Sequence, residues 1–293
     1  MQIRSSLPLV SVITPCFNSR HTIRETIESV RRQDYAKVEH VVVDGGSTDG
    51  TLDILREYPH LVWWSEKDEG HYHAMDKGIN RANGDVFTIL NADDCHREGV
   101  LTKVAEAFAR HPKWDGLAGD MVFVDGEGRE IFRREEACLD KQIIWCGFHN
   151  VANHQTLFLK REVYLRLGPY RYKEFKNCCD SEYLMRLIKA NCELGHINTL
   201  IVNYRYHDHG QSADLRVRAN MFAETERILR EYGVPGGFAG KCLFNYARIK
   251  RQVQKLLFRG KCDLIPGNWL LKKHLRARTQ FTSNIGKDNI KVL

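Results

Sequence analysis

Apolar runs alternate with amphipathic segments over the first 95 residues of the chain. Short apolar or β-branched runs occupy residues 9–14, 41–43, 61–64 and 86–90, and between them apolar residues recur every three or four positions. Runs of the first kind predict buried strands, and the periodic segments predict helices. Strands that alternate with helices indicate an α/β fold with a mostly parallel central sheet covered by helices.

Acidic residues stand where two of these predicted strands end. Asp44 follows the run 41–43, and the adjacent Asp93 and Asp94 follow the run 86–90. Ligands of parallel sheets bind at the carboxyl ends of the strands. Two neighbouring carboxylates repel each other unless a cation such as Mg²⁺ or Mn²⁺ bridges them to a ligand, commonly a phosphate. The pair therefore predicts a metal that holds a diphosphate, with a solvated turn at a helix start as the alternative.

The pattern is less regular after residue 98. A helix is predicted over residues 98–111, and a strand followed by a helix is predicted in "ANHQTLFLKREVYLRLG". The stretch "LAGDMVFVDGEGREIFRR" predicts a hairpin that turns at Asp125-Gly126. An amphipathic helix opens at Asp180, closing strands follow from residue 194, and residues 214–232 predict one exposed helix.

Length and cysteine usage narrow the class of protein. A chain of 293 residues with 43% hydrophobic residues can bury one large core. Its first residues hold one Arg and only a short apolar run, so we expect no signal peptide and a cytoplasmic location. The nine cysteines include no C-x-x-C pair, and the neighbours Cys178 and Cys179 cannot form a normal disulfide. This favours reduced thiols over a zinc site or a disulfide framework.

The positive charge lies near the C-terminal end. The net charge is +7, and residues 241–280 hold eleven Lys or Arg against one acid, so this segment carries +10 and the remainder −3. Cations alternate with regularly spaced apolar residues in "KCLFNYARIKRQVQKLLFRGK", and "NWLLKKHLRAR" adds a Trp. The pattern predicts a basic amphipathic helix on an anionic membrane surface. A helix packed on the folded domain and a nucleic-acid patch are the alternatives, and we expect no nucleic-acid partner.

Five stretches, taken together, resemble one family of enzymes. They are "VSVITPCFNSRHTIRETIESVRRQDY", "VVVDGGSTDGT", "SEKDEGHYHAMDKGINRANGDVFTILNADD", "HQTLFLKREVY" and "CCDSEYLMRL". In order and spacing they resemble the family 2 glycosyltransferases with the GT-A nucleotide-diphospho-sugar fold, above all those that build bacterial exopolysaccharide and lipid-linked repeat units. The resemblance implies a catalytic domain over residues 1–213, followed by a helical basic extension over residues 214–293.

The resemblance implies a nucleotide-sugar site built from several segments. Asp44 matches the acid that contacts uracil or ribose, although the family often has a second acid where Gly45 stands here. Asp93 matches a sugar or ribose contact and Asp94 a direct ligand of Mn²⁺ or Mg²⁺. The residues that match the base pocket and the border of the nucleotide and sugar are Pro15, Phe17, Asn18, Asp68, Asp76 and Lys77. For the last three, a salt-bridged helix surface is the alternative.

The catalytic base is expected at Asp180. An inverting transfer needs one carboxylate to take the proton of the attacking hydroxyl. In the family an acid usually precedes this Asp, where Cys179 stands here, and Glu182 is the alternative base.

Histidines are also expected in the site. By the same resemblance His207 is the expected metal or diphosphate contact, with His209 as its alternative. The pair His154-Gln155 matches a family pair expected on the acceptor side.

We therefore predict an inverting, metal-dependent glycosyltransferase on the inner face of the cytoplasmic membrane. Its donor would be a nucleotide-diphosphate sugar, with uridine expected first and guanosine or thymidine as alternatives, and its acceptor a lipid-linked saccharide. One competing function is a sugar nucleotidyltransferase, which expects a Gly-rich phosphate loop that "TPCFNSRHTI" lacks. The other is a non-catalytic subunit that binds a nucleotide sugar.

Overall fold

The computed structural model describes residues 7–147, 152–206 and 215–259. Its contacts divide the chain into a compact first unit, Met1–Arg251, and a second unit, Gln252–Leu293. The described part of the second unit is the end of helix α9 (Gly237–Arg259). All of the site described below lies in the first unit.

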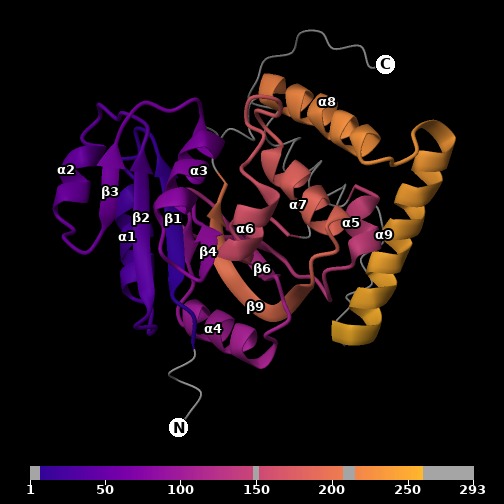
Figure 1. Ribbon diagram of the computed structural model, residues 1–293, viewed down its shortest axis with the longest axis horizontal. Coiled ribbons are helices and arrows are strands. Elements are labelled where there is room, and N and C mark those ends of the chain that lie inside the picture. The colour runs from indigo at the N-terminus through magenta and orange to yellow at the C-terminus, as the bar shows by residue number, and fades with distance from the viewer. Residues whose placement is uncertain (1–6, 148–151, 207–214, 260–293) are drawn as a thin grey trace. The chain divides into compact units, whose positions relative to one another are not determined.

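A sheet of nine strands among the described residues forms the centre of the first unit (Figure 1). Neighbouring strands are parallel in its first part, whose spatial order is β3 (Val62–Ser65), β2 (Val38–Asp44), β1 (Val10–Cys16) and β4 (Val86–Ile89). The chain runs outward from β1 to β3 and then returns to place β4 on the other side of β1. This change of direction beside β1 is where open α/β sheets bind their ligands.

The second part of the sheet mixes strand directions. It continues from β4 through β8 (Leu157–Lys160), β6 (Gly116–Val124) and β9 (Leu194–Arg205) to β5 (Cys95–His96). Of these neighbours only β6 and β9 are parallel. The predicted hairpin is confirmed, because β7 (Glu130–Arg134) pairs with β6, and the predicted closing strands form the single long strand β9.

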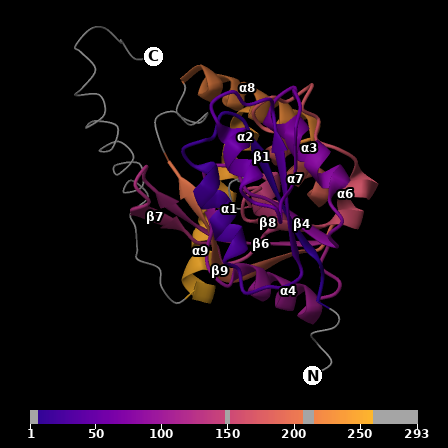
Figure 2. The ribbon, with the colours of Figure 1, turned by 90° about the vertical axis from the view of Figure 1, so that its left-hand side faces the viewer.

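Helices cover both faces of the parallel part, as predicted. Figure 2 shows α1 (Ile23–Arg31) and α3 (His71–Arg81) on opposite sides of β1. Val12 of β1 is buried in the core on the α1 side, whereas Ile13 is buried on the α3 side. Burial of both faces explains the continuous apolar runs. The other helices are α2 (Thr51–Arg56), α4 (Val100–Arg110), α5 (Lys141–Trp145), α6 (Arg161–Leu167) and α7 (Cys179–Lys189).

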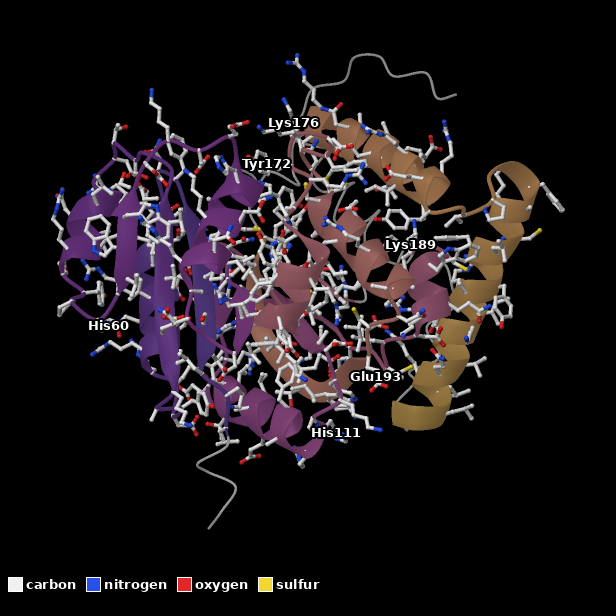
Figure 3. The ribbon with its side chains drawn as sticks, viewed as in Figure 1. His60, His111, Tyr172, Lys176, Lys189 and Glu193 are labelled. Atoms are coloured by element: carbon white, nitrogen blue, oxygen red, sulfur yellow. The ribbon has the colours of Figure 1, made fainter. Side chains whose placement is uncertain are left out.

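Helix α8 (Leu215–Glu231) belongs to the first unit. The predicted helix is confirmed, but one of its faces is buried: Ile228 is fully buried in the core that also contains α7. The carboxylate of Glu224 accepts backbone hydrogen bonds from Lys176 (3.0 Å), Asn177 (2.9 Å) and Cys178 (3.0 Å). Figure 3 labels Lys176, the first of these three residues. The functional boundary predicted at residue 213 stays a prediction.

We expect Glu224→Ala to destabilise the first unit by about 1–3 kcal/mol, because it leaves three backbone donors without their charged acceptor. Glu226→Ala is the matched control, since Glu226 is exposed on the same helix and its removal should change stability by less than about 0.5 kcal/mol. Urea unfolding at pH 7 measures both. Equal free energies of unfolding for the two variants would contradict the role of Glu224.

Candidate active site

The carboxylate of Asp44, at the end of β2, organises the loop that follows it. Asp44 is fully buried and accepts hydrogen bonds from the backbone N–H groups of Gly46 and Ser47, both at 2.9 Å, and from the hydroxyl of Ser65 at 2.6 Å. Burial alone would raise the pKa of Asp44, but hydrogen bonds donated by Ser47 and Ser65 hold it below its usual value. Asp44, which was predicted to contact the nucleotide, therefore stabilises the conformation of the loop that follows β2.

The loop after β1 is fastened to the loop after β2. The backbone N–H of Asn18 donates to the hydroxyl of Ser47 at 2.7 Å, and the side-chain oxygen of Asn18 accepts from the N–H of Thr48 at 3.0 Å. Asn18 has a left-handed backbone (φ 49°), which Asn tolerates better than most residues. These bonds present the ring of Phe17 to solvent with 61% of the residue exposed. Pro15 is buried within β1, beneath this loop.

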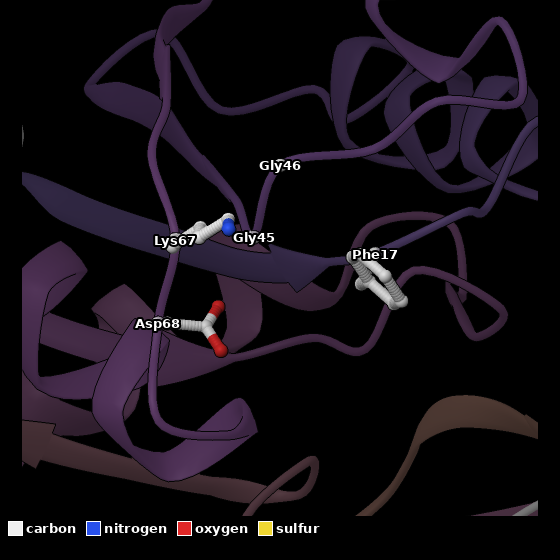
Figure 4. A pocket seen from close by; sticks show the side chains of 5 residues that line it. All are labelled: Phe17, Gly45, Gly46, Lys67 and Asp68. Atoms are coloured by element: carbon white, nitrogen blue, oxygen red, sulfur yellow. The ribbon is translucent and has the colours of Figure 1, made fainter.

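Phe17 is one wall of a pocket of about 420 Å³ (Figure 4). The other walls are Gly45 and Gly46 after β2, and Lys67 and Asp68 after β3. Three predicted nucleotide segments thus meet at one edge of the sheet. An exposed aromatic ring beside polar groups is suited to a stacked base.

Of the three residues predicted to border the nucleotide and sugar, only Asp68 lines this pocket. Lys77 forms an ion pair with Glu66 at 3.1 Å and donates to the backbone oxygen of Lys67 at 3.0 Å, so it holds the strand end that carries Asp68. Asp76 is buried on the opposite side of α3. It accepts hydrogen bonds from the Tyr164 hydroxyl and the Tyr170 N–H, and burial raises its pKa to about 6.

The two acids after β4 have different environments. Asp93 is partly exposed, as is Asn91, whereas Asp94 is 1% exposed. The carboxylate of Asp94 accepts hydrogen bonds from the N–H of Arg205 at 2.8 Å and the side-chain amide of Gln155 at 3.3 Å. Burial and the neighbouring charge of Asp93 raise the pKa of Asp94 well above its usual value.

Arg205, at the end of β9, closes the same loop. Its guanidinium donates to the backbone oxygens of Asp93 at 3.1 Å and Gly126 at 2.7 Å, and it also pairs with Glu25. The sequence analysis missed Arg205 because the contact joins segments that are more than 100 residues apart. The hydrophobic pattern of β9 carries no sign of it.

Asp180, in the first turn of α7, is held by two side chains. The hydroxyl of Tyr72 donates to one carboxylate oxygen at 2.9 Å, and Nδ1 of His154 lies 3.2 Å from the other. Burial raises the pKa of Asp180, but the hydrogen bond and charge of His154, with the Tyr72 hydroxyl, lower it to about 2. The side chain is still 29% exposed, so the ionised carboxylate is accessible. Tyr72 was not among the predicted site residues.

One short turn connects Asp180 to the acid pair. His154 contacts Asp180, and the next residue, Gln155, donates to Asp94. The turn is closed by a hydrogen bond from the N–H of Thr156 to the backbone oxygen of Asn153 at 2.9 Å. The predicted family pair His154-Gln155 therefore spans the two acidic centres.

Glu182, the alternative base, has a different environment from Asp180. It is fully buried and bonded to Arg186 at 2.6 Å and to the hydroxyl of Tyr232 at 2.7 Å. These contacts join α7 to the end of α8 and leave no access for an acceptor. His207 and His209, the predicted metal contacts, lie outside the described residues.

The described residues contain no cluster of three or more His, Cys, Asp or Glu side chains that could hold a metal by themselves. Mg²⁺ and Mn²⁺ in phosphate-transfer sites are often held by one or two carboxylates together with phosphate oxygens of the substrate. The partly exposed Asp93 and Asn91 offer oxygen atoms of that kind at the end of β4. The oxygen ligands that Asp93 and Asn91 offer thus suit a metal ion that binds together with a diphosphate.

Comparison with known families identifies this arrangement. The family model described as glycosyl transferase family 2 matches residues 11–168, more than half of the chain. The protein is a family 2 glycosyltransferase. The predicted family and the GT-A-type α/β fold are both confirmed.

Relatives of this glycosyltransferase agree with that assignment. A PGL/p-HBAD biosynthesis glycosyltransferase of Mycobacterium bovis is 30% identical over 218 residues, which cover 68% of this chain and 82% of the relative. S. aureus TarS 1–349 in complex with UDP-GlcNAc superposes with a TM-score of 0.57 at 19% identity, covering 84% of this chain and 81% of that one. The chain spans 44% of a longer TarS structure.

A third similar protein is the mannosyltransferase PcManGT of Pyrobaculum calidifontis, solved with GDP-Man and Mn²⁺. Its TM-score is 0.58 at 21% identity, with 95% of this chain and 84% of that chain covered. At identities of 19% and 21%, these two solved structures support the fold of the glycosyltransferase but do not assign its site residues.

We expect Asp76→Asn to change how the stability of the glycosyltransferase depends on pH. Because the pKa of Asp76 is raised to about 6 in the folded state, the wild type loses stability as pH rises from the unfolded pKa to the folded one. The variant lacks this titration. The free energy of unfolding of Asp76→Asn minus that of the wild type should therefore increase by about 2 kcal/mol between pH 4 and pH 7.5.

Urea unfolding at the two pH values measures this difference. The control is Asp53→Asn, which replaces an aspartate that is 77% exposed on α2. A constant difference for Asp76→Asn would mean that its carboxyl titrates normally.

Proposed function

We propose that this glycosyltransferase transfers a sugar, with inversion, from a nucleotide diphosphate to a hydroxyl group of a saccharide acceptor. The observation that carries the proposal is the accessible carboxylate of Asp180, held ionised by Tyr72 and His154 and connected through Gln155 to the acid pair after β4. A base and a leaving-group site joined through neighbouring residues of one closed turn suit an in-line displacement.

Asp180 is the base in this proposal. The attacking hydroxyl becomes strongly acidic as its oxygen bonds to the anomeric carbon, so a carboxylate of low pKa suffices to accept the proton late in the step. The low pKa also keeps Asp180 ionised at every physiological pH. Nδ1 of His154 lies 3.2 Å from the carboxylate of Asp180, and this contact supports a positioning role for His154.

The leaving diphosphate would lie beside the end of β4. A bound Mn²⁺ or Mg²⁺ would supply positive charge to stabilise the negative charge that develops there. The exposure of Asp93 and the burial of Asp94 favour Asp93 as the metal contact and Asp94 as its support, in place of the direct ligand predicted at Asp94. The neighbour solved with GDP-Man and Mn²⁺ supports the use of such an ion.

The donor is proposed to be a uridine diphosphate sugar bound in the pocket beside Phe17. The UDP-GlcNAc complex of TarS supports this choice, and the GDP-Man complex keeps guanosine as the alternative. The family assignment removes the support for a sugar nucleotidyltransferase. A role in bacterial cell-surface polysaccharide synthesis rests on the resemblance of the five sequence stretches.

We expect Asp180→Asn to lower turnover by about 10²–10⁴-fold, the usual contribution of a general base, while donor binding is retained. Release of UDP from UDP-sugars measures turnover, and the shift of the melting temperature by UDP and Mn²⁺ measures binding. Asp53→Asn on the surface of α2 should change neither. Full turnover by Asp180→Asn would assign the base elsewhere, and a wild type that binds donor without turnover would favour the non-catalytic subunit.

The acceptor is proposed to be lipid-linked, because one face of α9 suits a membrane surface. Within the first unit, Ala247 of α9 is buried, and Lys250 and Arg251 form ion pairs with Asp140 and Glu136. Apolar side chains at helical spacing are exposed along the same helix: Tyr246, Ile249, Val253, Leu256 and Leu257. Among the described helices none is long and apolar enough to span a bilayer. The exposed apolar residues of α9 are proposed to bind the inner face of the cytoplasmic membrane as an interfacial helix.

We expect the full chain to bind vesicles that contain about 30% anionic lipid and to bind less as salt increases, because cations contribute to the attraction. Replacing both Tyr246 and Ile249 by Ser should weaken the partition coefficient at least about tenfold, since two apolar side chains no longer enter the interface. Phe222→Ser is the control, at a residue that is 70% exposed on α8. Equal losses in sedimentation assays, or no binding by the wild type, would contradict an α9 membrane face.

A further inference from the structure

Gly45 lies in the base pocket at a position where a side chain would collide with Asp68. A Cβ atom placed on Gly45 would lie 2.6 Å from Oδ2 of Asp68, closer than real Cβ contacts come, and 3.5 Å from Cδ2 of Phe17. The ring, the carboxylate and the glycine backbone therefore converge on one small volume. Figure 4 shows Phe17 and the Asp68 carboxylate on either side of Gly45.

The backbone itself does not demand glycine at position 45. Gly46 has a left-handed φ of 91°, which disfavours any side chain, whereas Gly45 is not among the residues with positive φ. A side chain at residue 45 would therefore force the Asp68 carboxylate to move. The carboxylate occupies the space that an acidic residue at position 45 would use.

Asp68 is fixed in that space through one of its oxygens. Oδ1 accepts a hydrogen bond from the N–H of Gly70 at 2.8 Å, at the start of α3. Lys77, bonded to the backbone oxygen of Lys67, holds the preceding residue. Oδ2 is the oxygen of Asp68 that lies nearest to Gly45.

We infer that the carboxylate of Asp68 recognises the ring N–H of a uracil or guanine base stacked on Phe17. The inference rests on the proposed function and specifies the base class of the donor. Uracil N3–H and guanine N1–H are donors that a carboxylate accepts. Cytosine N3 and adenine N1 are acceptors at the equivalent position, so their lone pairs would face a negative charge without a proton between them.

A contact with the ribose or the transferred sugar is the competing role for Asp68. If Asp68 contacts the ribose, Asp68→Ala should weaken the binding of all four nucleotides equally. If Asp68 contacts the transferred sugar, Asp68→Ala should leave the binding of UDP unchanged, because UDP lacks that sugar. The free diphosphates UDP, GDP, CDP and ADP therefore separate the three roles. Isothermal titration of the full chain with each of them, in the presence of Mn²⁺, is the measurement.

For the wild type we expect UDP or GDP to bind at least about tenfold more tightly than CDP and ADP, the range of one hydrogen bond to a charged group. Asp68→Ala should remove most of that preference by weakening the preferred nucleotide and leaving CDP nearly unchanged. Glu69→Ala, at the exposed neighbour of Asp68, should retain the full preference.

Transferring the carboxylate from residue 68 to residue 45 provides a sharper test. Gly45→Asp alone should weaken the preferred nucleotide, because the new side chain collides with Asp68 and adds a like charge. The double variant Gly45→Asp/Asp68→Ala should bind the preferred nucleotide more tightly than either single variant, with at least part of the preference over CDP restored.

The outcomes separate this inference from the proposed function. A wild type that binds none of the four diphosphates would contradict the proposed function itself. A wild type that binds UDP or GDP with an unchanged preference after Asp68→Ala would overturn only the inference, as would a double variant that binds no better than Asp68→Ala. Uniform weakening of all four nucleotides by Asp68→Ala would assign Asp68 to the ribose.

Discussion

The turn at residues 153–156 sets the relation between the two acidic centres of this enzyme. His154 contacts Asp180 at the start of α7, and its neighbour Gln155 donates to Asp94 at the end of β4. Consecutive residues of a closed turn cannot move far relative to each other. The proposed base and the proposed leaving-group site therefore keep a fixed separation even though they lie on segments more than 80 residues apart. Such preorganisation lowers the cost of orienting the reactants.

Acidic side chains serve this fold in two ways that burial distinguishes. Asp44, Asp94 and Glu182 are buried and surrounded by donors, as a carboxylate inside a protein must be. They hold the loops and helices on which the other acids stand. Asp68, Asp93 and Asp180 retain access to solvent and so can contact a substrate. A substitution in the first group is expected to act through the shape of the site, and one in the second through its chemistry.

The sequence predicted most of the fold because the hydrophobic patterns of strands and helices depend on residues that are close together in the chain. Apolar runs identify β1, β2 and β4, and helical spacing identifies α1, α3 and α7. It also placed Phe17 and Asp68 in segments that the structure brings together around one pocket. The sequence did not predict which of the two acids is buried, because Asp93 and Asp94 are the same residue type in adjacent positions. Asp94 differs from Asp93 through its contacts with Arg205 and Gln155, which are distant in the sequence. The partners Tyr72 and Glu224 depend on long-range packing for the same reason.

The proposed catalytic residues extend beyond the segment that the family model matches. That match ends at residue 168, whereas Asp180 lies on α7, whose entry is held by Glu224 of α8. Glu182 adds a second connection, because its buried carboxylate accepts from Tyr232 just after α8. The orientation of the proposed base thus depends on the region that the sequence suggested as a separate extension. If α9 rests on a membrane, its ion pairs to Glu136 and Asp140 would transmit the orientation of that surface to the same compact unit. An acceptor held in the bilayer would then meet a base whose position is fixed relative to the lipid.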